Sequence, residues 1–304
     1  MDVPPSSGDL LVILNPTANR GKMQRPRALV RRRLAQEKGD YVETKRPGEA
    51  RELALHAARE GRPVIVVGGD GTINEVVNGI LSSGRHVPLG IIAAGSGNDF
   101  AWNTLKLPRD PATAVERAFA GRLIDVDAGT VNGTYFANSF SVGLDADIAE
   151  AFAAMTYLSF LPGSVHYYAA VLRRLLFGYQ RCPRLTFRLD DRIQETPVEQ
   201  RYVLIAVTNG PSYGAGFHIN PRADCCDGLL DVCTIDYTPL IRALRLLPVV
   251  KAGKHASLPE VTFYRAKTVH IESVQPVCTE VDGETSHTTH CVVQVLPGAL
   301  SIRV

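Results

Sequence analysis

Short apolar runs alternate with amphipathic segments over the first 125 residues of the chain. Strands are expected at 10–14, 41–44, 63–67 and 89–93, and the continuous apolar run at 10–14 is typical of a strand buried on both faces. Helical composition follows at about 24–38, 49–60, 72–81 and 110–121. In the last of these segments Asp110 and Pro111 suit the N-cap and the first helical position. This alternation predicts a mostly parallel sheet covered on both faces by helices.

The pattern changes near residues 125–131, where strand-like stretches begin to follow one another with few helices between them. Period-2 alternation at Leu185, Phe187 and Leu189 predicts an antiparallel sheet with one face in solvent. The expected strands are 124–128, 134–140, 184–189, 202–208, 229–235, 267–272, 277–281 and 291–295, and helices are expected near 149–177 and 239–253. We therefore predict two domains, residues 1–130 and 131–295, with 296–304 returning to the first.

Composition narrows the class of protein. A chain of 304 residues fits about two domains, and 45% apolar and 21% charged residues are ordinary for a soluble protein. A net charge of +2 gives no case for nucleic-acid binding, and six cysteines without a C-x-x-C pair indicate reduced thiols. Residues 1–9 do not resemble a signal peptide, and no run reaches the ~20 apolar residues of a spanning helix. The expected location is cytoplasmic, either soluble or peripheral to a membrane.

A glycine-rich turn follows the expected strand 63–67, where residues 68–72 read Gly-Gly-Asp-Gly-Thr. Glycines let a ligand approach the backbone, and the start of the next helix adds N–H donors and partial positive charge, which suits phosphate. Asp70 fits a nucleotide that arrives with Mg²⁺. A plain strand–helix connection, in which Thr72 and Glu75 form a capping box, explains neither the three glycines nor the aspartate.

A second turn of this kind follows the expected strand 89–93. Residues 95–100 read Gly-Ser-Gly-Asn-Asp-Phe, and a helix start is expected there. A polar turn after the expected strand 10–14 begins at Asn15. Because the carboxyl ends of parallel strands share one edge of a sheet, we expect these turns to flank one ligand at a switch point. The sequence contains neither a Walker A pattern nor G-x-G-x-x-G, which excludes an ordinary P-loop.

These motifs occur in the order seen in the diacylglycerol kinase catalytic-domain family, which the sequence resembles. Among its members the bacterial soluble lipid kinases are the most similar, and sphingosine and ceramide kinases are relatives. The resemblance covers nearly the whole chain, through Asp125-x-Asp127-x-Gly129, Phe136-Ala137-Asn138, Val142-Gly143-Leu144-Asp145, the stretch 227–232 and Val281-Asp282-Gly283-Glu284. Gly-Gly-Asp-Gly alone is shared with NAD kinases and phosphofructokinases, whereas the full series is much more specific.

The resemblance implies roles for individual residues. The ATP site would comprise Asn15, Thr17, Gly68, Gly69, Gly71, Thr72, Glu75, Gly95, Ser96 and Asn98. Asp70, Asp99, Asp127 and Asp282 would form the acidic network around catalytic Mg²⁺, and Glu284 would be the general base for the lipid hydroxyl. Asp227, with the backbone carbonyls of Asp224 and Leu229, would hold a second, structural Mg²⁺. This chain reads Asp-Cys-Cys-Asp at 224–227, where the family often has Lys and Asp.

Three features allow alternative interpretations. Asp282-Gly283 is a common hairpin signal, so this stretch is either a plain turn or the place of the base Glu284. The segment 151–179 is apolar and aromatic with Arg173 and Arg174, which fits a core helix as well as a bilayer contact or an acyl slot. Basic residues near 240–254 fit attraction of anionic lipid as well as a solvated helix face, and the pattern favours the solvated face.

The sequence thus predicts an ATP-dependent lipid kinase that transfers the γ-phosphate to a hydroxyl of diacylglycerol or a related lipid, with Mg²⁺. The expected architecture is an N-terminal Rossmann-like three-layer α/β domain and a C-terminal antiparallel, sandwich-like β-rich domain, with a cleft between them. The expected partner is a lipid at a membrane surface, in phospholipid metabolism, and a homodimer stays open. The alternatives are an NAD kinase-like kinase of a soluble acceptor and a non-catalytic nucleotide-binding regulatory protein.

Overall fold

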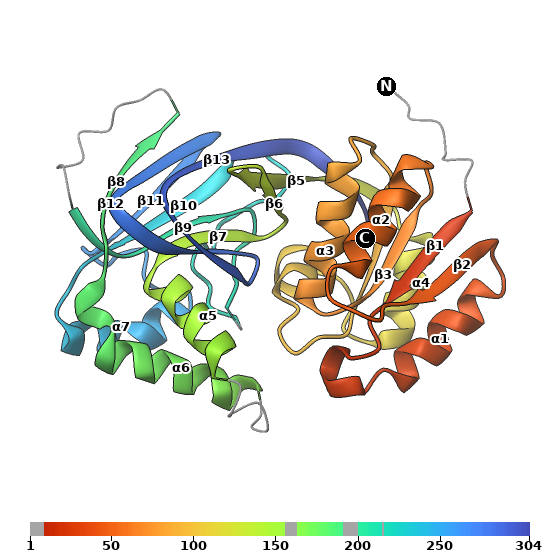
Figure 1. The fold of residues 1–304 in the computed structure, drawn as a ribbon, viewed down its shortest axis with the longest axis horizontal. Helices are drawn as coiled ribbons and strands as arrows, with labels where there is room; N and C mark the ends of the chain where they lie inside the picture. The colour runs from red at the N-terminus through yellow and green to blue at the C-terminus, as the bar shows by residue number, and fades with distance from the viewer. Residues whose placement is uncertain (1–8, 156–162, 191–199, 215) are drawn as a thin grey trace. The chain divides into compact units, whose positions relative to one another are not determined.

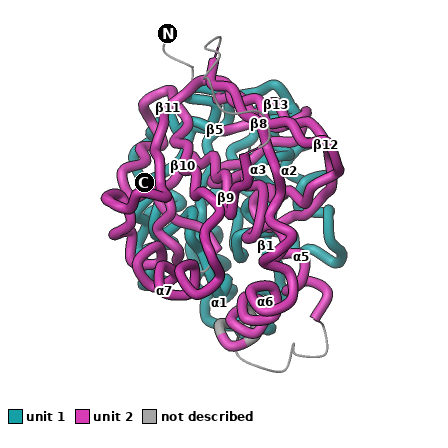
Figure 2. The backbone as a smooth tube through the Cα atoms, turned by 90° about the vertical axis from the view of Figure 1, so that its left-hand side faces the viewer, with its two compact units in different colours: residues 1–128, 296–304 teal, residues 129–295 magenta. Residues whose placement is uncertain are grey.

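The computed structural model describes residues 9–155, 163–190, 200–214 and 216–304. It divides into two compact units, which Figure 2 distinguishes by colour. Unit 1 comprises Met1–Ala128 and Leu296–Val304, and unit 2 comprises Gly129–Val295. The chain passes between the units within strand β5 (Leu123–Val131) and again within strand β13 (Glu284–Arg303).

Unit 1 is built on a parallel sheet, as the alternating pattern predicts. Its strands are β1 (Leu10–Leu14), β2 (Gly39–Glu43), β3 (Val64–Gly68) and β4 (Pro88–Ala93), in the order β2-β1-β3-β4. The end of β13 adds a further parallel strand beside β4 through Ser301 and Ile302. Every residue of β3 is buried, since helices cover both faces of the sheet at this point.

Four helices cover this sheet, namely α1 (Gln24–Leu34), α2 (Glu49–Arg59), α3 (Asp70–Ser82) and α4 (Pro111–Ala120). Helices α1 and α4 share a core with one face of the strands, while α2 packs against α3. Helix α4 begins as predicted, because the Asp110 carboxylate accepts the N–H of Thr113 at 2.9 Å. The helix expected after the second glycine turn is only the single turn Phe100–Thr104, and the backbone turns left-handed soon after it, at Lys106 with a φ of 55°.

Unit 2 is β-rich and antiparallel, which confirms the predicted fold class. Its strands are β6 (Thr134–Phe136), β7 (Ser139–Gly143), β8 (Arg184–Leu189), β9 (Gln200–Thr208), β10 (Leu230–Asp236), β11 (Val261–Ala266) and β12 (Thr268–Val281). Their order is β11-β10-β9-β7-β12-β13, and β8 pairs with both β12 and β9. Strand β11 was not predicted, and the two expected strands 267–272 and 277–281 are one strand with an irregular register between Glu272 and Val277.

Three helices lie on one side of the unit 2 sheet, as Figure 1 shows. They are α5 (Leu144–Ala154), α6 (Gly163–Phe177) and α7 (Leu240–Lys251), and their inward side chains share a buried cluster. The helical segment expected near 149–177 is therefore two helices, and residues 156–162 between them lie outside the described residues. In the described part of the chain, no helix combines the length and the apolar character that crossing a bilayer requires.

Candidate functional site

A pocket of about 490 Å³ lies at the carboxyl-end edge of the unit 1 sheet. It is lined by the turns that follow all four parallel strands β1 to β4. Strand β1 pairs with β2 on one side and with β3 on the other, so the strand order reverses between β1 and β3. Ligands of open parallel sheets bind at such a reversal, which makes this pocket the candidate site of the unit.

Most of the predicted ATP-site residues line this pocket. They are Asn15, Thr17, Gly69, Gly71, Thr72, Glu75, Gly95 and Ser96, together with Asp70. Gly68 and Asn98 are not among the lining residues. A Cβ on Gly68 would lie 2.7 Å from the Cβ of Thr72, so this glycine is a packing requirement.

Asn98 holds the second glycine turn in shape. Its side-chain oxygen accepts the N–H of Gly95 at 2.8 Å, and its amide nitrogen donates to the carbonyl of Gly95 at 2.7 Å. Its φ of 60° lies in the left-handed region, which asparagine tolerates better than most residues. We therefore assign Asn98 a structural role in forming the site.

The start of α3 differs from the capping box that Thr72 and Glu75 suggested. Helix α3 begins at Asp70 with Gly69 as its N-cap, two residues earlier than the sequence indicated. The Thr72 hydroxyl instead accepts from the Asn15 amide at 2.9 Å, and Glu75 accepts the N–H of Ala50 at 3.2 Å. Because Gly69 has no side chain to cap the helix, the first N–H groups of α3 are open to an anion.

Asp70 lines the pocket, and Asp99 is buried behind the lining, close enough for its charge to act on Asp70. The carboxylate of Asp70 accepts the N–H of Asn98 at 2.6 Å, and the carboxylate of Asp99 accepts from the Asn103 amide at 2.7 Å. Burial raises the pKa of Asp70, and the negative charge of Asp99 raises it further. Two interacting carboxylates in a partly buried site are the oxygen donors that Mg²⁺ prefers, so these residues fit that ion.

The loop between β2 and α2 contributes residues that sequence reasoning missed. Thr44, Lys45, Arg46, Pro47 and Ala50 line the same pocket. Lys45 and Arg46 bring positive charge to a place where the glycine turns favour phosphate. The available signal was their position directly after the second predicted strand, at the sheet edge that Asn15 and Gly69 also occupy.

Asp127, assigned to the acidic network, stabilises the returning C-terminal segment. It is buried in β5, and its carboxylate accepts the N–H of Gly298 at 2.7 Å. Both residues belong to unit 1, so this bond ties the end of the chain to the first domain. A place for Asp127 around a metal stays a prediction.

The turn at Asp282 and Gly283 is a β-hairpin, with φ values of 46° and 96° that suit a type I′ turn. The Asp282 carboxylate accepts the N–H groups of Ala137, Asn138 and Ser139 at 2.7, 3.1 and 2.8 Å. This gives Asp282 a structural role that the sequence did not indicate. Glu284 begins β13 beside the turn and is exposed, and its role as base stays a prediction.

The loop at residues 224–229, expected to hold a structural metal, forms an ion pair with Arg265. Asp224 accepts the N–H of Cys226 and Asp227 accepts that of Leu229, both at 3.1 Å. The guanidinium of Arg265 forms an ion pair with Asp227 and lies 3.7 Å from Asp231. Arg265 therefore balances part of the negative charge of this loop, and a structural metal at Asp227 stays a prediction.

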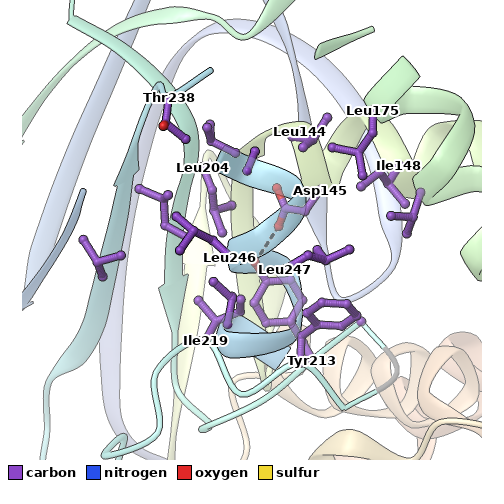
Figure 3. A pocket seen from close by; sticks show the side chains of 18 residues that line it. Leu144, Asp145, Ile148, Leu175, Leu204, Tyr213, Ile219, Thr238, Leu246 and Leu247 are labelled. Carbon is purple, nitrogen blue, oxygen red and sulfur yellow. Dashed lines mark hydrogen bonds between the residues drawn. The ribbon is translucent and has the colours of Figure 1, made fainter. Parts of the chain in front are cut away.

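A second, apolar pocket of about 110 Å³ lies in unit 2 between the sheet and helices α5 to α7. Figure 3 shows its lining, which is almost entirely aliphatic and aromatic. The one charged residue is Asp145, whose carboxylate accepts from the Tyr213 hydroxyl at 2.5 Å. Burial raises the pKa of Asp145. Val171 and Leu175 of α6 line this pocket, so the inner side of α6 is both a core face and a pocket wall.

Glu280 lies buried near Asp145 and the hairpin. Its carboxyl group accepts from the Ser141 hydroxyl at 3.2 Å and from the N–H of Gly283. Burial, with the negative charges of Asp145 and Asp282, raises the pKa of Glu280 to about 8. Sequence reasoning assigned this residue no role, because a single Glu within a strand pattern gives no signal of its burial.

Two family models match the chain. The model of the diacylglycerol kinase catalytic domain matches residues 9–131, and that of the YegS C-terminal NAD kinase beta sandwich-like domain matches residues 138–304. The diacylglycerol kinase of Staphylococcus carnosus (strain TM300) is 30% identical over 278 residues, covering 90% of this chain and 87% of its own. That of Mycobacterium tuberculosis (strain ATCC 25618 / H37Rv) is 32% identical over 261 residues, covering 84% and 81%.

The fold is also similar to that of solved structures. A crystal structure of a protein from Bacillus anthracis str. Sterne has a TM-score of 0.80 at 25% identity, covering 97% of this chain and 96% of that chain. The match extends over both units, so the similarity is to a whole protein.

Proposed function

The chain belongs to the diacylglycerol kinase family of lipid kinases, and we propose that it transfers the γ-phosphate of ATP to the hydroxyl of diacylglycerol or a related lipid, with Mg²⁺. The observation that carries this proposal is the pocket of unit 1, where the predicted nucleotide residues gather at one sheet edge. Open N–H groups at the start of α3 and the basic loop after β2 suit a polyphosphate.

The carboxylates of Asp70 and Asp99 would hold the metal ion. When bound, Mg²⁺ neutralises charge on the phosphates and orients the γ-phosphate. Asn98 supports this donor set by fixing the second turn and by donating its backbone N–H to Asp70. Glu284 is proposed to accept the proton of the acceptor hydroxyl, since it is an exposed carboxylate beside a tight β-hairpin turn.

The apolar pocket of unit 2 supports a lipid acceptor. Its lining favours a hydrocarbon chain over a nucleotide or a sugar, because almost all of its walls are aliphatic or aromatic. Its volume of about 110 Å³ is below the ~300–1,000 Å³ of usual ligand pockets, so in this conformation it has room for only part of an acyl chain.

An NAD kinase-like kinase of a soluble acceptor is the second candidate. The description of the matched C-terminal model, an NAD kinase beta sandwich-like domain, is the observation in its favour. The apolar lining of the unit 2 pocket argues against it, since a dinucleotide needs polar partners. A regulatory protein without catalysis is the third candidate, and intact carboxylates at Asp70, Asp99 and Glu284 argue against that one.

The deciding experiment is transfer of labelled γ-phosphate from ATP to a panel of lipids in mixed micelles, with NAD and water-soluble alcohols in parallel. We expect label in one lipid class, only when Mg²⁺ is present. Label in NAD or a soluble alcohol alone would refute the lipid acceptor and leave the nucleotide site standing. Binding of ATP with no transfer to any acceptor would support the regulatory candidate.

A further inference from the structure

Exposed apolar side chains gather on two helices of unit 2. Among the described residues, nine large apolar side chains are exposed, and seven of them belong to α6 and α7. These seven, which we call the docking face, are Val165, Tyr168, Leu172, Leu176, Phe177, Ile241 and Leu244. Phe177 is 80% and Ile241 68% exposed, which are large values for such side chains. Contiguous apolar surface of this kind marks an interaction site.

The docking face draws on two helices that contact each other. Val165, Tyr168, Leu172 and Leu176 follow one another at helical spacing and form one stripe along α6. The ammonium group of Lys251 on α7 contacts the Tyr168 hydroxyl and lies 4.7 Å from the centre of its ring, which joins the helices.

Both helices are also apolar on the side that faces the sheet. Val171 and Leu175 of α6, and Leu246 and Val250 of α7, line the apolar pocket. A helix that only covers a sheet needs one apolar stripe, so the exposed apolar stripe of α6 requires another explanation. On α7 the exposed and the pocket-lining residues lie on opposite sides, whereas on α6 the two sets adjoin, because Tyr168 and Leu175 are only about 20° apart around the helix axis.

The charge of these helices favours an anionic partner. Helices α6 and α7 contain five Arg and Lys residues and no Asp or Glu, although the whole chain has 33 basic and 31 acidic residues. Arg174 pairs with Asp147 and Arg242 with Glu260, both at 2.8 Å. Arg173 and Arg245 are exposed beside the apolar stripes. Apolar side chains flanked by basic ones are typical of helices that lie on anionic membranes.

We propose that the docking face binds the surface of a membrane that contains anionic lipids, with α6 and α7 lying along it. A symmetric contact between two copies would bring two positively charged faces together, which disfavours a second copy as the occupant. The proposal deepens the proposed function and rests on it for the lipid acceptor, because docking puts the apolar pocket beside the acyl chains. Membrane binding itself is measurable without catalysis.

The test is sedimentation of the full chain with vesicles of phosphatidylcholine, with and without phosphatidylglycerol. We expect binding that requires phosphatidylglycerol and weakens with salt. In the double variant Arg173→Gln, Arg245→Gln, the partition coefficient onto these vesicles should fall about 30-fold, because each removed charge accounts for about fivefold. Leu172→Gln with Leu176→Gln should also weaken binding, by at least about tenfold.

The matched control is Leu123→Gln with Val274→Gln, which replaces the two exposed apolar side chains outside the docking face, at 49% and 83% exposure. This pair should bind vesicles as the wild type does. The proposal is overturned if the wild type binds neither vesicle, or if the control pair loses as much binding as the docking-face pair. It is also overturned if the docking-face pair abolishes a dimer in sedimentation velocity and leaves vesicle binding unchanged.

Phosphate transfer to a short-chain lipid dispersed in detergent separates this proposal from the proposed function. The docking-face variants should keep wild-type transfer to that dispersed lipid, because they leave the active residues intact. Vesicle binding without transfer to any lipid would refute the proposed function and support docking. Transfer to the dispersed lipid with no vesicle binding would do the reverse.

Discussion

Gly69 and Gly95 follow different strands of the unit 1 sheet, yet their backbones are in contact. A Cβ on Gly95 would lie 2.5 Å from the Cα of Gly69, and a Cβ on Gly69 would lie 3.0 Å from the Cα of Gly95. Because both obstacles are backbone atoms, neither can rotate away. The two turns can lie together at the pocket only because neither residue has a side chain.

We expect Gly95→Ala to lower the free energy of unfolding by about 1–3 kcal/mol, the usual cost of overpacking. The displaced turn should also weaken ATP binding. Denaturant unfolding and nucleotide titration measure the two effects separately.

Gly71→Ala is the matched control for Gly95→Ala. A Cβ on Gly71 would meet nothing within 4 Å, and alanine suits its position in the first turn of α3. Stability should therefore stay equal or rise, while the added methyl group at the pocket lowers ATP affinity by about tenfold. Equal losses of stability in the two variants would contradict the role of the Gly69–Gly95 contact.

Asp70→Asn should separate activity from stability. Loss of the carboxylate charge should lower kcat by at least about 10²–10³-fold, since that charge would hold the metal ion. The unfolding free energy measured without nucleotide should be unchanged or higher, because burial and Asp99 both disfavour the ionised carboxyl group. A near-wild-type kcat would remove Asp70 from the mechanism.

The sequence predicted the parts of the fold and of the site that depend on residues adjacent in the sequence. Apolar runs located strands β1, β3 and β4, and Asp110 with Pro111 located the start of α4. The glycine turns predicted the phosphate pocket because strand ends in a parallel sheet share an edge. Lys45 and Arg46 were missed because their loop joins the pocket only once β2 pairs with β1, and strand order is not a local property.

Long-range contacts account for the remaining differences. Asp282 accepts N–H groups from residues 137–139, far away in the sequence, so its structural role has no local signal. Strand β13 runs through Thr and His residues and past Pro297 and Gly298, which by themselves indicate a loop. Its length is set by pairing with β12 and β4, and the sequence therefore predicted only its apolar part, 291–295.

Glu284→Gln tests the proposed base. If Glu284 accepts the hydroxyl proton, kcat should fall by about 10²–10⁴-fold, while ATP affinity stays the same. Stability should not change, because Glu284 is exposed. Steady-state kinetics with saturating lipid, together with ATP titration, distinguish these outcomes. An unchanged kcat would leave Glu284 as a hairpin residue only.

The buried carboxyl group of Glu280 should make stability depend on pH. Its pKa is raised from 4.5 to about 8, chiefly by burial, so the folded protein retains a proton that the unfolded chain releases between these values. Because the native state binds more protons in this window, this group's contribution to stability is largest below pH 4.5 and falls as pH rises toward 8. The maximal slope for one proton is about 1.4 kcal/mol per pH unit.

Glu280→Gln removes this titration while keeping the shape of the side chain and an oxygen for the N–H of Gly283. The variant should gain stability relative to the wild type as pH rises from 6.5 to 7.5, by about 1 kcal/mol. Urea unfolding at several pH values measures this difference. The control is Glu284→Gln, which changes an exposed residue and should follow the wild-type curve. If the plots of unfolding free energy against pH were parallel for wild type and Glu280→Gln, Glu280 would be ionised in the folded protein. A buried ionised carboxylate needs a compensating positive charge, which the neighbouring Asp145 and Asp282 do not supply.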